Sequence, residues 1–375
     1  MRIGLVCPYG INKGGGVQEI VKSLQSGLKK RGHDVYIITP RPNGHTDPHD
    51  EHVIFVGGST DFRSPIQTTV QISAAQSEGI YEMLEEMDFD VLHFHEPWVP
   101  MLSSQILARS EAANVATFHA KLPENTVSRT MAKVITPYTK PILKYFDALT
   151  APSEAAAEYV CSLTDQPVAI IPNGINVYQF TPPEKFDDDR KNKTILYVGR
   201  LEGRKGVKYL IRAFKLLSKE RPDVSLVIAG DGPDRAKLEM LADDLELDNV
   251  KFLGFVSHED KIKLFQTSDL FCAPALFGES FGVVLLEAMA CGLVTVAGDN
   301  PGYEAVMGGL GALSLVDPKH SAEFARRLDL LLHQKELREL WRKWAASEID
   351  QYSWDNVIDQ FEDIYQEALT AKRRR

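Results

Sequence analysis

The feature that most constrains the fold of this chain is an alternation of short apolar runs with segments of helical period, repeated from end to end. Runs of four or five residues rich in Val, Ile and Leu are typical of strands buried on both faces of a parallel sheet. They lie at 3–7, 35–39, 53–56, 91–95, 115–119, 148–151, 168–171, 195–199, 226–229, 250–253, 270–273 and 294–297. The alternation predicts an α/β protein whose ligand sites lie beyond the carboxyl ends of the strands.

One break in this alternation predicts a boundary between two domains. Pro172-Asn173-Gly174 and Pro182-Pro183 interrupt the pattern, and the charged run 187–191 follows them. A length of 375 residues also fits two domains. We therefore expect two Rossmann-like, doubly wound domains, 1–173 and 174–354, facing a central cleft. A polar segment at 66–87 is predicted as a helix of the first domain.

The composition excludes several classes of protein. Lys and Arg total 42 against 52 Asp and Glu, a net charge of −10, which argues against a nucleic-acid partner. The apolar stretch at the N-terminus is too short for a signal peptide, and the chain has no apolar run of membrane-spanning length. Four scattered cysteines are expected to be small core residues in a reducing compartment. We expect a cytoplasmic protein, with peripheral contact at the inner face of the membrane left open.

The segment 277–292 carries the strongest functional signal. Gly278 and Ser280 mark a turn and a helix start, and an almost wholly apolar helix is expected to run to Gly292. Glu279 and Glu287 interrupt it, roughly 12 Å apart along a helix axis. Free N–H groups of Ser280, Phe281 and Gly282 would favour an anion between them. The pattern predicts a cradle for a nucleotide-sugar, with the alternative of a buried helix whose Glu287 faces water.

Loops after other strands carry further candidates. Gly14-Gly15-Gly16 lets backbone N–H groups approach a phosphate or a sugar, although a flexible turn would look the same. Arg200 and Lys205 follow a strand and suit a pyrophosphate. His119 and His95 each end a strand, where a lone His more often has a structural role. The loops 230–233 and 254–257, with Val256, are placed to frame a base through backbone atoms.

Taken together, these residues resemble the family 4 retaining glycosyltransferases, which have the GT-B fold. The resemblance covers nearly the whole chain, and its most specific element is the pair of Glu279 and Glu287 with seven residues between them. Within the family, Cys7-Pro8-Tyr9, the 15–18 segment, His95-Glu96-Pro97 and the 116–119 segment are most similar to bacterial phosphatidylinositol mannosyltransferases.

The resemblance implies a role for each matching position. It makes His119, Arg200, Lys205 and Glu279 the catalytic residues. The donor-binding set it implies is Gly15, Gly16, Arg200, Lys205, Val256, Glu279, Ser280, Phe281, Gly282 and Glu287. Arg200 and Lys205 would bind the donor pyrophosphate and Glu287 the ribose hydroxyls. The acceptor side is assigned to Tyr9, Gln18 and Lys121.

The resemblance also implies how the reaction runs. Departure and attack occur on one face of the sugar, the leaving phosphate helps to deprotonate the acceptor, and no metal or other cofactor is needed. The acidic run 187–189 and Asp88-Phe89-Asp90 would then be surface acids. A C-terminal helix, 355–375, would pack back on the first domain. The expected partners are a nucleotide-sugar donor, GDP-mannose or a UDP-sugar, and a polar or lipid alcohol acceptor.

One departure from the lipid-modifying relatives weakens the assignment of the acceptor. They carry a basic amphipathic helix before the fourth strand, whereas the corresponding stretch here contains five acids, at 78, 82, 85, 86 and 88, and has no Lys or Arg after Arg63. The favoured function is transfer of a hexose to an alcohol acceptor, with mannose from GDP-mannose as the favoured donor and phosphatidylinositol or a related lipid as the favoured acceptor. The alternatives are a UDP-sugar-dependent transferase with another acceptor, a catalytically silent nucleotide-binding subunit, and a sugar-nucleotide epimerase.

Overall fold

The computed structural model describes residues 1–12, 15–41, 51–63, 69–74, 77–99, 101–121 and 126–374. The chain forms two compact units, which are described separately. Unit 1 comprises Met1–Gly174 and Trp354–Arg375, and unit 2 comprises Ile175–Ser353. These limits lie within one residue of the domain limits expected from the sequence. The expected cleft between the domains stays a prediction.

Unit 1 is built on an eight-stranded sheet with the order β4-β3-β2-β1-β5-β6-β7-β8. Its strands are β1 (Arg2–Val6), β2 (Asp34–Arg41), β3 (Val53–Arg63), β4 (Thr69–Ala74), β5 (Val91–His95), β6 (Ala113–Thr117), β7 (Ala148–Ala151) and β8 (Val168–Ile170). All neighbouring pairs are parallel except β3 and β4. The order reverses between β1 and β5, where the two strands leave a topological switch point at their carboxyl ends.

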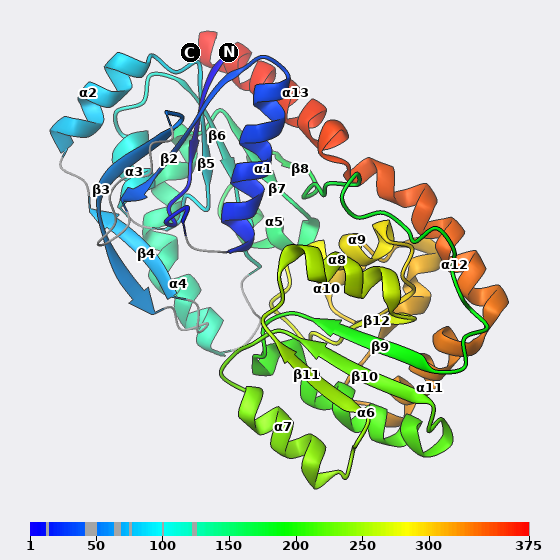
Figure 1. Ribbon diagram of the computed structural model, residues 1–375. Helices are drawn as coiled ribbons and strands as arrows, with labels where there is room; N and C mark the ends of the chain where they lie inside the picture. Colours follow the sequence, from blue (N-terminus) through cyan, green and yellow to red (C-terminus); the bar gives the residue numbers. More distant parts are fainter. Residues whose placement is uncertain are drawn as a thin grey trace. The chain divides into compact units, whose positions relative to one another are not determined.

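Helices cover both faces of this sheet (Figure 1). They are α1 (Gly16–Lys30), α2 (Ser77–Met87), α3 (Leu102–Leu107), α4 (Thr126–Ile142), the short 3-10 helix η1 (Leu143–Tyr145), α5 (Glu154–Cys161) and α13 (Trp354–Arg373). Val21, Leu24 and Leu28 of α1 share one hydrophobic core with Ile358 and Tyr365 of α13. The closing helix thus packs on the first domain, as the sequence resemblance implied, and α2, α3 and η1 contribute to the core on the opposite face.

Unit 2 has a six-stranded, wholly parallel sheet with the order β11-β10-β9-β12-β13-β14. The strands are β9 (Lys193–Val198), β10 (Val224–Ala229), β11 (Val250–Gly254), β12 (Leu270–Ala273), β13 (Thr295–Gly298) and β14 (Leu315–Val316). In sequence order this is 3-2-1-4-5-6, the order of dinucleotide-binding Rossmann domains. The switch point lies between β9 and β12.

The helices of unit 2 also form two layers. They are α6 (Val207–Glu220), α7 (Arg235–Asp244), α8 (His258–Thr267), α9 (Val283–Ala290), α10 (Pro301–Glu304), α11 (Ser321–His333) and α12 (Lys335–Glu348), with 3-10 turns η2 (Gly203–Lys205), η3 (Gly309–Ser314) and η4 (Ile349–Tyr352). Figure 1 shows α6 and α11 on one face of the sheet and α8 and α9 on the other. The expected pair of doubly wound α/β domains is confirmed.

Two expectations about local structure were wrong. The segment 66–87 is not one helix, because the hairpin strand β4 occupies Thr69–Ala74 before α2 begins at Ser77; residues 64–68 and 75–76 lie outside the described part. Cys161 is not a core residue, since it ends α5 on an exposed face, while Cys7, Cys272 and Cys291 are buried as expected.

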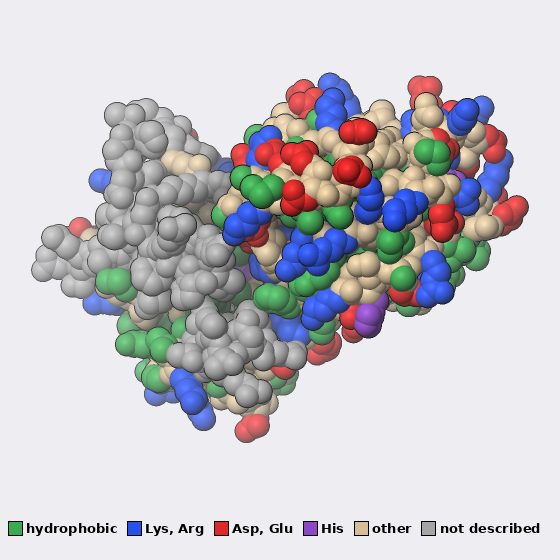
Figure 2. All heavy atoms as spheres, turned by 90° about the horizontal axis from the view of Figure 1, so that it is seen from below, with side chains coloured by type: hydrophobic (Ala, Val, Ile, Leu, Met, Phe, Trp, Pro, Cys, Tyr) green, Lys and Arg blue, Asp and Glu red, His purple; other side chains and the backbone are tan. Residues whose placement is uncertain are grey.

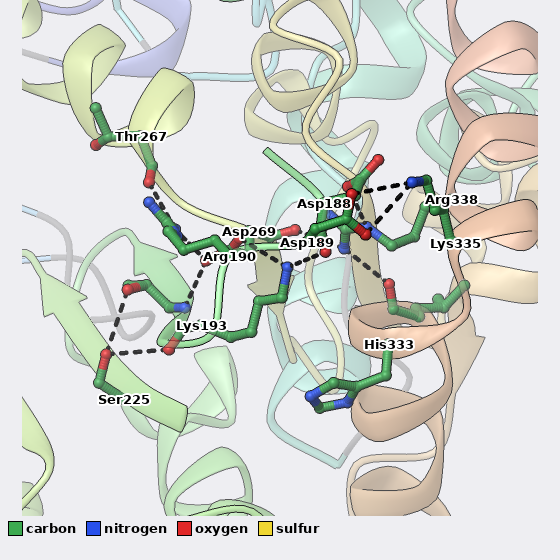
Figure 3. A network of polar contacts seen from close by, with 12 residues as sticks. Asp188, Asp189, Arg190, Lys193, Ser225, Thr267, Asp269, His333, Lys335 and Arg338 are labelled. Atoms are coloured by element: carbon green, nitrogen blue, oxygen red, sulfur yellow. Dashed lines mark hydrogen bonds and ion pairs between the residues drawn. The ribbon is translucent and has the colours of Figure 1, made fainter. Parts of the chain in front are cut away.

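The acidic run 187–189 is not simply a surface loop (Figure 3). Asp188 accepts from Arg338 Nε at 2.8 Å and from Arg342 Nη1 at 2.7 Å, and its side chain is only 9% exposed. Burial would raise the pKa of Asp188, but the hydrogen bonds from Arg342 and Arg338 outweigh it and hold that pKa below its usual range. Arg338 also donates to the carbonyl of Asp269. The network fastens α12 to the loop before β9 and to the start of β12.

Candidate active site

The donor-side candidates of unit 2 follow strands that meet at its switch point. Arg200 and Lys205 follow β9, and Glu279 follows β12, the strand beside it. Because parallel strands end at the same edge of a sheet, these loops come together although 74 positions separate Lys205 from Glu279 in the sequence. The backbone joins them directly, since the N–H of Leu276 donates to the carbonyl of Arg204 at 2.9 Å.

A close approach of backbone at Gly206 supports this junction. Gly206 has a left-handed conformation, with φ of 73°, and a Cβ there would lie 1.9 Å from the carbonyl oxygen of Pro274. Only glycine combines that conformation with that distance at acceptable strain. Glycine at 206 therefore allows the loop bearing Lys205 to lie against the loop that leads to Glu279.

Glu279 is bound by two cations. Arg204 Nη1 lies 2.6 Å and Lys205 Nζ 2.9 Å from its Oε1 atom. The structure thus brings together the predicted pair Lys205 and Glu279. It adds Arg204, which the sequence reasoning had passed over although it stands inside the same glycine-bounded loop.

A second carboxylate, Glu202, lies behind these cations. It contacts Arg204 Nε at 3.2 Å and Arg200 Nη2 at 2.8 Å, and its side chain is 5% exposed. Glu202 therefore fixes two guanidinium groups, one of which, Arg200, stays half exposed. Three cations against two carboxylates leave a local surplus of positive charge, which suits a multiply charged anion such as a diphosphate.

The helix after Glu279 begins later than the sequence suggested. Its cap is Gly282, with φ of 115°, and the first helical residue is Val283. Ser280 is thus not the cap, and the free first-turn N–H groups include those of Val283 and Val284 rather than the predicted three at 280–282. A Cβ at Gly282 would lie 2.8 Å from the ring of Tyr303, so glycine is needed there for packing as well as for conformation.

Glu287, inside this helix, is paired. Lys261 Nζ of α8 lies 2.6 Å from its Oε1 atom, and the two side chains are 20% and 13% exposed. Burial raises the pKa of Glu287, while the charge and hydrogen bond of Lys261 oppose that rise. Lys261 also lies over the ring of Phe180, 5.2 Å from its centroid. Glu287 is thus largely buried and does not face water, contrary to the alternative, and the pair leaves one carboxylate oxygen for a further contact.

The loops expected to frame a base adjoin the same edge. The N–H of Gly199 donates to the carbonyl of Ala229, and that of Gly230 donates to the carbonyl of Gly254. The ends of β9, β10 and β11 are thereby joined in a row, and Val256 follows the last of them with its side chain half-buried. Its contact with a base stays a prediction.

In unit 1, His119 belongs to a buried cluster after β5 and β6. Its Nε2 atom lies 2.9 Å from Nδ1 of His95, and the rings stack with centroids 5.2 Å apart. Its backbone N–H donates to Oε1 of Glu96, a residue held at φ of 52°. Burial lowers the pKa of His119 to about 3. His119 is therefore a neutral imidazole that can exchange hydrogen bonds but does not supply a positive charge.

Glu96 is the residue of this cluster that the sequence reasoning undervalued. It is 1% exposed, and burial raises the pKa of its carboxyl to about 7 despite the N–H groups of His119 and Ala120 bonded to it. Glu96 is a buried glutamate in the left-handed conformation directly after a strand, and strained residues of this kind are concentrated at functional sites. Its carboxylate accepts a hydrogen bond from the backbone N–H of His119 and so holds the backbone there.

The histidine layer continues to the closing helix. Thr150 Oγ1 donates its one proton to the carbonyl of Ala116, so it must accept in its bond with Thr117. Thr117 Oγ1 therefore donates to Thr150, and it accepts from His93 Nε2 at 2.6 Å. His93 Nδ1 must then accept from the hydroxyl of Tyr365 in α13, 2.8 Å away. This chain of bonds sets the tautomer of His93 and ties α13 to the strand that carries His95.

The remaining candidates of unit 1 lie in the segments that follow β1 and β6. Gly15 caps α1 in an extended conformation, with the side chain of Gln18 folded against it, and the space around Gly16 is open; Gly14 lies outside the described residues. Burial raises the pKa of Tyr9 well above its usual value. Lys121 reaches Glu158 of α5 at 3.6 Å. The acceptor roles of Tyr9, Gln18 and Lys121 stay predictions.

In the ranges that the structure describes, no three His, Cys, Asp or Glu residues lie together as a metal site would require. No helix within those ranges is long and apolar enough to cross a bilayer.

Family models match both halves of the chain. The model described as Glycosyltransferase Family 4 matches residues 14–179, and Glycosyl transferases group 1 matches 180–348. Among solved structures, a sucrose-phosphate synthase from Thermosynechococcus elongatus superposes with a TM-score of 0.78 over 99% of both chains, at 20% identity. That likeness concerns the fold, and it confirms the two Rossmann-like domains of the GT-B class.

Curated relatives are similar over nearly their whole length. The phosphatidyl-myo-inositol mannosyltransferase of Mycolicibacterium smegmatis is 33% identical, covering 98% of this chain and 94% of its own. The enzyme of that name from Propionibacterium freudenreichii is 30% identical, with 97% and 94% covered. The chain belongs to glycosyltransferase family 4, and within it is similar to phosphatidylinositol mannosyltransferases.

Proposed function

We propose that this glycosyltransferase moves mannose from GDP-mannose to a hydroxyl group of phosphatidylinositol, with retention of anomeric configuration and without a metal ion. The observation that carries the proposal is the convergence of Arg204 and Lys205 on Glu279 at the switch point of unit 2. The names of the relatives support the choice of mannose and of an inositol lipid.

The donor diphosphate is assigned to Arg200 and Lys205. Breaking the bond to the sugar leaves negative charge on the diphosphate, which cations fixed in advance stabilise in the transition state. Glu202 supplies that fixation for Arg200, which it contacts from the buried side together with Arg204, and Glu279 holds Lys205. Glu279 would bind hydroxyls of the sugar, and its contacts with Arg204 and Lys205 hold its carboxylate in place for that purpose.

The nucleoside is assigned to the helix α9 and the loops beside it. Glu287 accepts from Lys261 through Oε1, so Oε2 is available to accept from ribose hydroxyls. Val256 and the backbone at 230–233 would adjoin the base. A neutral His119 would hydrogen-bond to the sugar as an uncharged group, which avoids placing a cation beside a positively charged sugar-like transition state.

A transfer assay tests the proposal. The full chain is incubated with radiolabelled GDP-mannose, or with UDP-sugars, and with phosphatidylinositol in detergent micelles or soluble inositol phosphates as acceptors. We expect label in the lipid fraction with GDP-mannose, and its loss in Lys205→Ala. Lys208→Ala, on the exposed side of α6, is the matched control and should transfer normally.

The other outcomes separate the alternatives. Label transferred only from a UDP-sugar would contradict the donor, and label found only in a soluble product would contradict the lipid acceptor. A rearranged sugar nucleotide formed without acceptor would indicate an epimerase. Nucleotide binding without any transfer would indicate a silent subunit, and the proposal would then be wrong.

A further inference from the structure

Two histidines of unit 1 form a buried pair. His95 ends β5, and Thr117 of the neighbouring strand β6 lies opposite it in the register, so His119 comes two residues after the partner of His95. His95 is 0% exposed and His119 is 6% exposed. A histidine at the surface is in a different situation. One lies on the face of unit 2 seen in Figure 2, where water can bond to both ring nitrogens.

One hydrogen bond joins the two rings. His95 Nδ1 and His119 Nε2 are 2.9 Å apart. Burial lowers the pKa of both imidazoles, that of His119 to about 3, so both rings are neutral. A neutral imidazole carries one N–H group and one bare nitrogen, so one ring must donate and the other must accept. The choice also decides the state of the other nitrogen in each ring.

Two arrangements of the protons satisfy this bond. In the first, His119 donates from Nε2, which leaves its Nδ1 bare and requires the proton of His95 to be on Nε2. In the second, His95 donates from Nδ1, and His119 then carries its proton on Nδ1. The two arrangements give His119 Nδ1 opposite hydrogen-bonding character, although the rings occupy the same positions. His95 therefore controls what His119 offers to a ligand.

The two other nitrogens of the pair are available to a ligand. Within the described residues, His119 Nδ1 and His95 Nε2 are buried and have no hydrogen-bond partner. Buried polar atoms without a partner are rare, and each one needs an explanation. His95 ends a strand that borders the switch point of unit 1, where ligands of such sheets bind. Because Nε2 of His119 is already bonded to His95, Nδ1 is the ring nitrogen that His119 has left for a ligand.

The ring of His95 is held in place by its neighbours. Its centroid lies 4.2 Å from that of His93 and 5.2 Å from that of His119, and the rings of His95 and His119 are within 12° of parallel. The backbone N–H of His119 donates to Glu96, which fixes the other side of the pair. His95 is thus a partner whose orientation is set before any ligand binds.

We propose that His95 is a positioning residue for sugar transfer: it accepts the Nε2 proton of His119 and so leaves His119 Nδ1 bare to accept a hydrogen bond from a hydroxyl group of the sugar. That contact rests on the proposed function, in which His119 bonds to the sugar. A sugar that is losing its leaving group carries positive charge in the transition state. A bare nitrogen presents negative partial charge to it, whereas an N–H group would present positive partial charge.

The hydrogen bond to His95 also strengthens that interaction. A ring that donates from one nitrogen becomes a better acceptor at the other, because the two bonds polarise each other. His95 therefore acts on the reaction through His119 and need not touch the sugar. Its effect should appear in turnover rather than in the binding of the nucleoside diphosphate, which is assigned to unit 2.

The positions of the protons are measured by nitrogen-15 NMR of the full chain labelled at its histidines, without donor or acceptor. The bare and the protonated nitrogen of a neutral imidazole differ widely in chemical shift, and His119→Asn identifies the signals of His119. We expect a bare Nδ1 and a protonated Nε2 in both His95 and His119 at pH 7. A protonated Nδ1 in His119 would overturn the proposal, whatever reaction the chain catalyses.

Two replacements of His95 separate its hydrogen bond from its packing. The side-chain oxygen of Asn occupies the place of Nδ1, so His95→Asn keeps an acceptor for His119, whereas the amide of Gln reaches the place of Nε2. We expect His95→Gln to lower kcat about tenfold, the contribution of one neutral hydrogen bond, with unchanged affinity for the nucleoside diphosphate. His95→Asn should keep most of the turnover. In the NMR spectrum, His119 should become a mixture of two tautomers in His95→Gln alone.

Tyr365→Phe is the matched control within the same buried layer. It removes the hydroxyl that lies 2.8 Å from His93 Nδ1 and leaves the bond between His95 and His119 intact. Thermal unfolding should show a loss of stability in this variant as in His95→Gln. Its turnover and the tautomer of His119 should nevertheless remain those of the original chain.

The kinetic results can also overturn the proposal. Full turnover in His95→Gln would show that the bond to His119 does not matter, and equal losses in His95→Asn and His95→Gln would assign the effect to packing. A loss in Tyr365→Phe as large as in His95→Gln would assign it to the stability of the histidine layer. If the chain transfers no sugar from any donor, the proposed function is wrong, and the NMR spectrum alone decides whether His95 fixes the tautomer.

Discussion

Replacing Lys261 by Met should reveal how much the buried ion pair with Glu287 contributes to the stability of unit 2. Lys261 Nζ lies 2.6 Å from Glu287 Oε1, and both side chains are at least four-fifths buried. Removing one partner of a buried pair leaves an uncompensated charge, which costs about 3 kcal/mol. Met has a similar length and keeps the apolar contact with Phe180, so packing changes little.

The free energy of unfolding that Lys261→Met loses should depend on pH in a defined direction. Burial raises the pKa of Glu287 above its unfolded value, and without Lys261 the rise is larger. Between those two pKa values the folded state binds more protons than the unfolded state, so the free energy of unfolding falls as the pH rises. Lys261→Met should therefore be least destabilised at pH 5, where Glu287 takes up a proton, and most at pH 8.

Urea denaturation at pH 5 and pH 8 measures the free energy of unfolding of each variant. Glu287→Gln and the double variant complete a double-mutant cycle. In the double variant neither charge remains, so most of the lost free energy should return. Equal destabilisation at pH 5 and pH 8, or no recovery in the double variant, would refute the assignment of a buried ion pair. The cycle needs no ligand and is independent of the proposed chemistry.

Four further predictions concern function and stability. Arg200→Ala and Lys205→Ala should each lower turnover about 100-fold, because each removes a cation that stabilises the leaving diphosphate; full turnover with normal nucleotide affinity would contradict the donor assignment. Glu287→Gln should weaken binding of the nucleoside diphosphate about tenfold in calorimetry and slow chemistry less, because a ribose contact is similar in ground and transition states. EDTA should leave transfer intact, and a strict requirement for Mg²⁺ or Mn²⁺ would point to another mechanism. The free energy of unfolding should decline as the pH falls below 6.5, since burial lowers the pKa of His93 and of His119 to about 3, and the two protons that the unfolded state binds in that range outnumber the one that Glu96, whose pKa burial raises to about 7, holds in the folded state; a flat profile would contradict the buried, neutral imidazoles.

The strands were predictable from the sequence because most of them are buried on both faces. Leu270–Ala273 is a continuous apolar run, and Val91–His95 is buried throughout although it contains two histidines. Both runs are bounded by turn residues, which leaves little ambiguity about their period. The hairpin strand β4 was missed for the opposite reason. Thr69–Ala74 pairs with one neighbour at the edge of the sheet, and its β-branched residues Thr69, Val70 and Ile72 form too short an alternation to stand out from the polar segment around them.

The start of α9 illustrates a limit of capping rules. Ser280 has the side chain expected of a cap, yet Gly282 caps the helix because the chain must turn between Tyr303 and the loop that carries Glu279. A contact with a residue 21 positions later decided that geometry. Local preference predicted the helix and missed its first turn.

The partners of the predicted site residues were harder to foresee than the residues themselves. Lys205 and Glu279 could be singled out because they stand next to glycines and just after strands. Lys261, by contrast, lies in the middle of an ordinary charged helix. The crossover from β11 to β12 brings α8 back over β9, onto the face that also carries α9. Only this path places Lys261 beside Glu287. A carboxylate in an apolar helix therefore predicts that a cation is near, whereas the topology decides which residue supplies it.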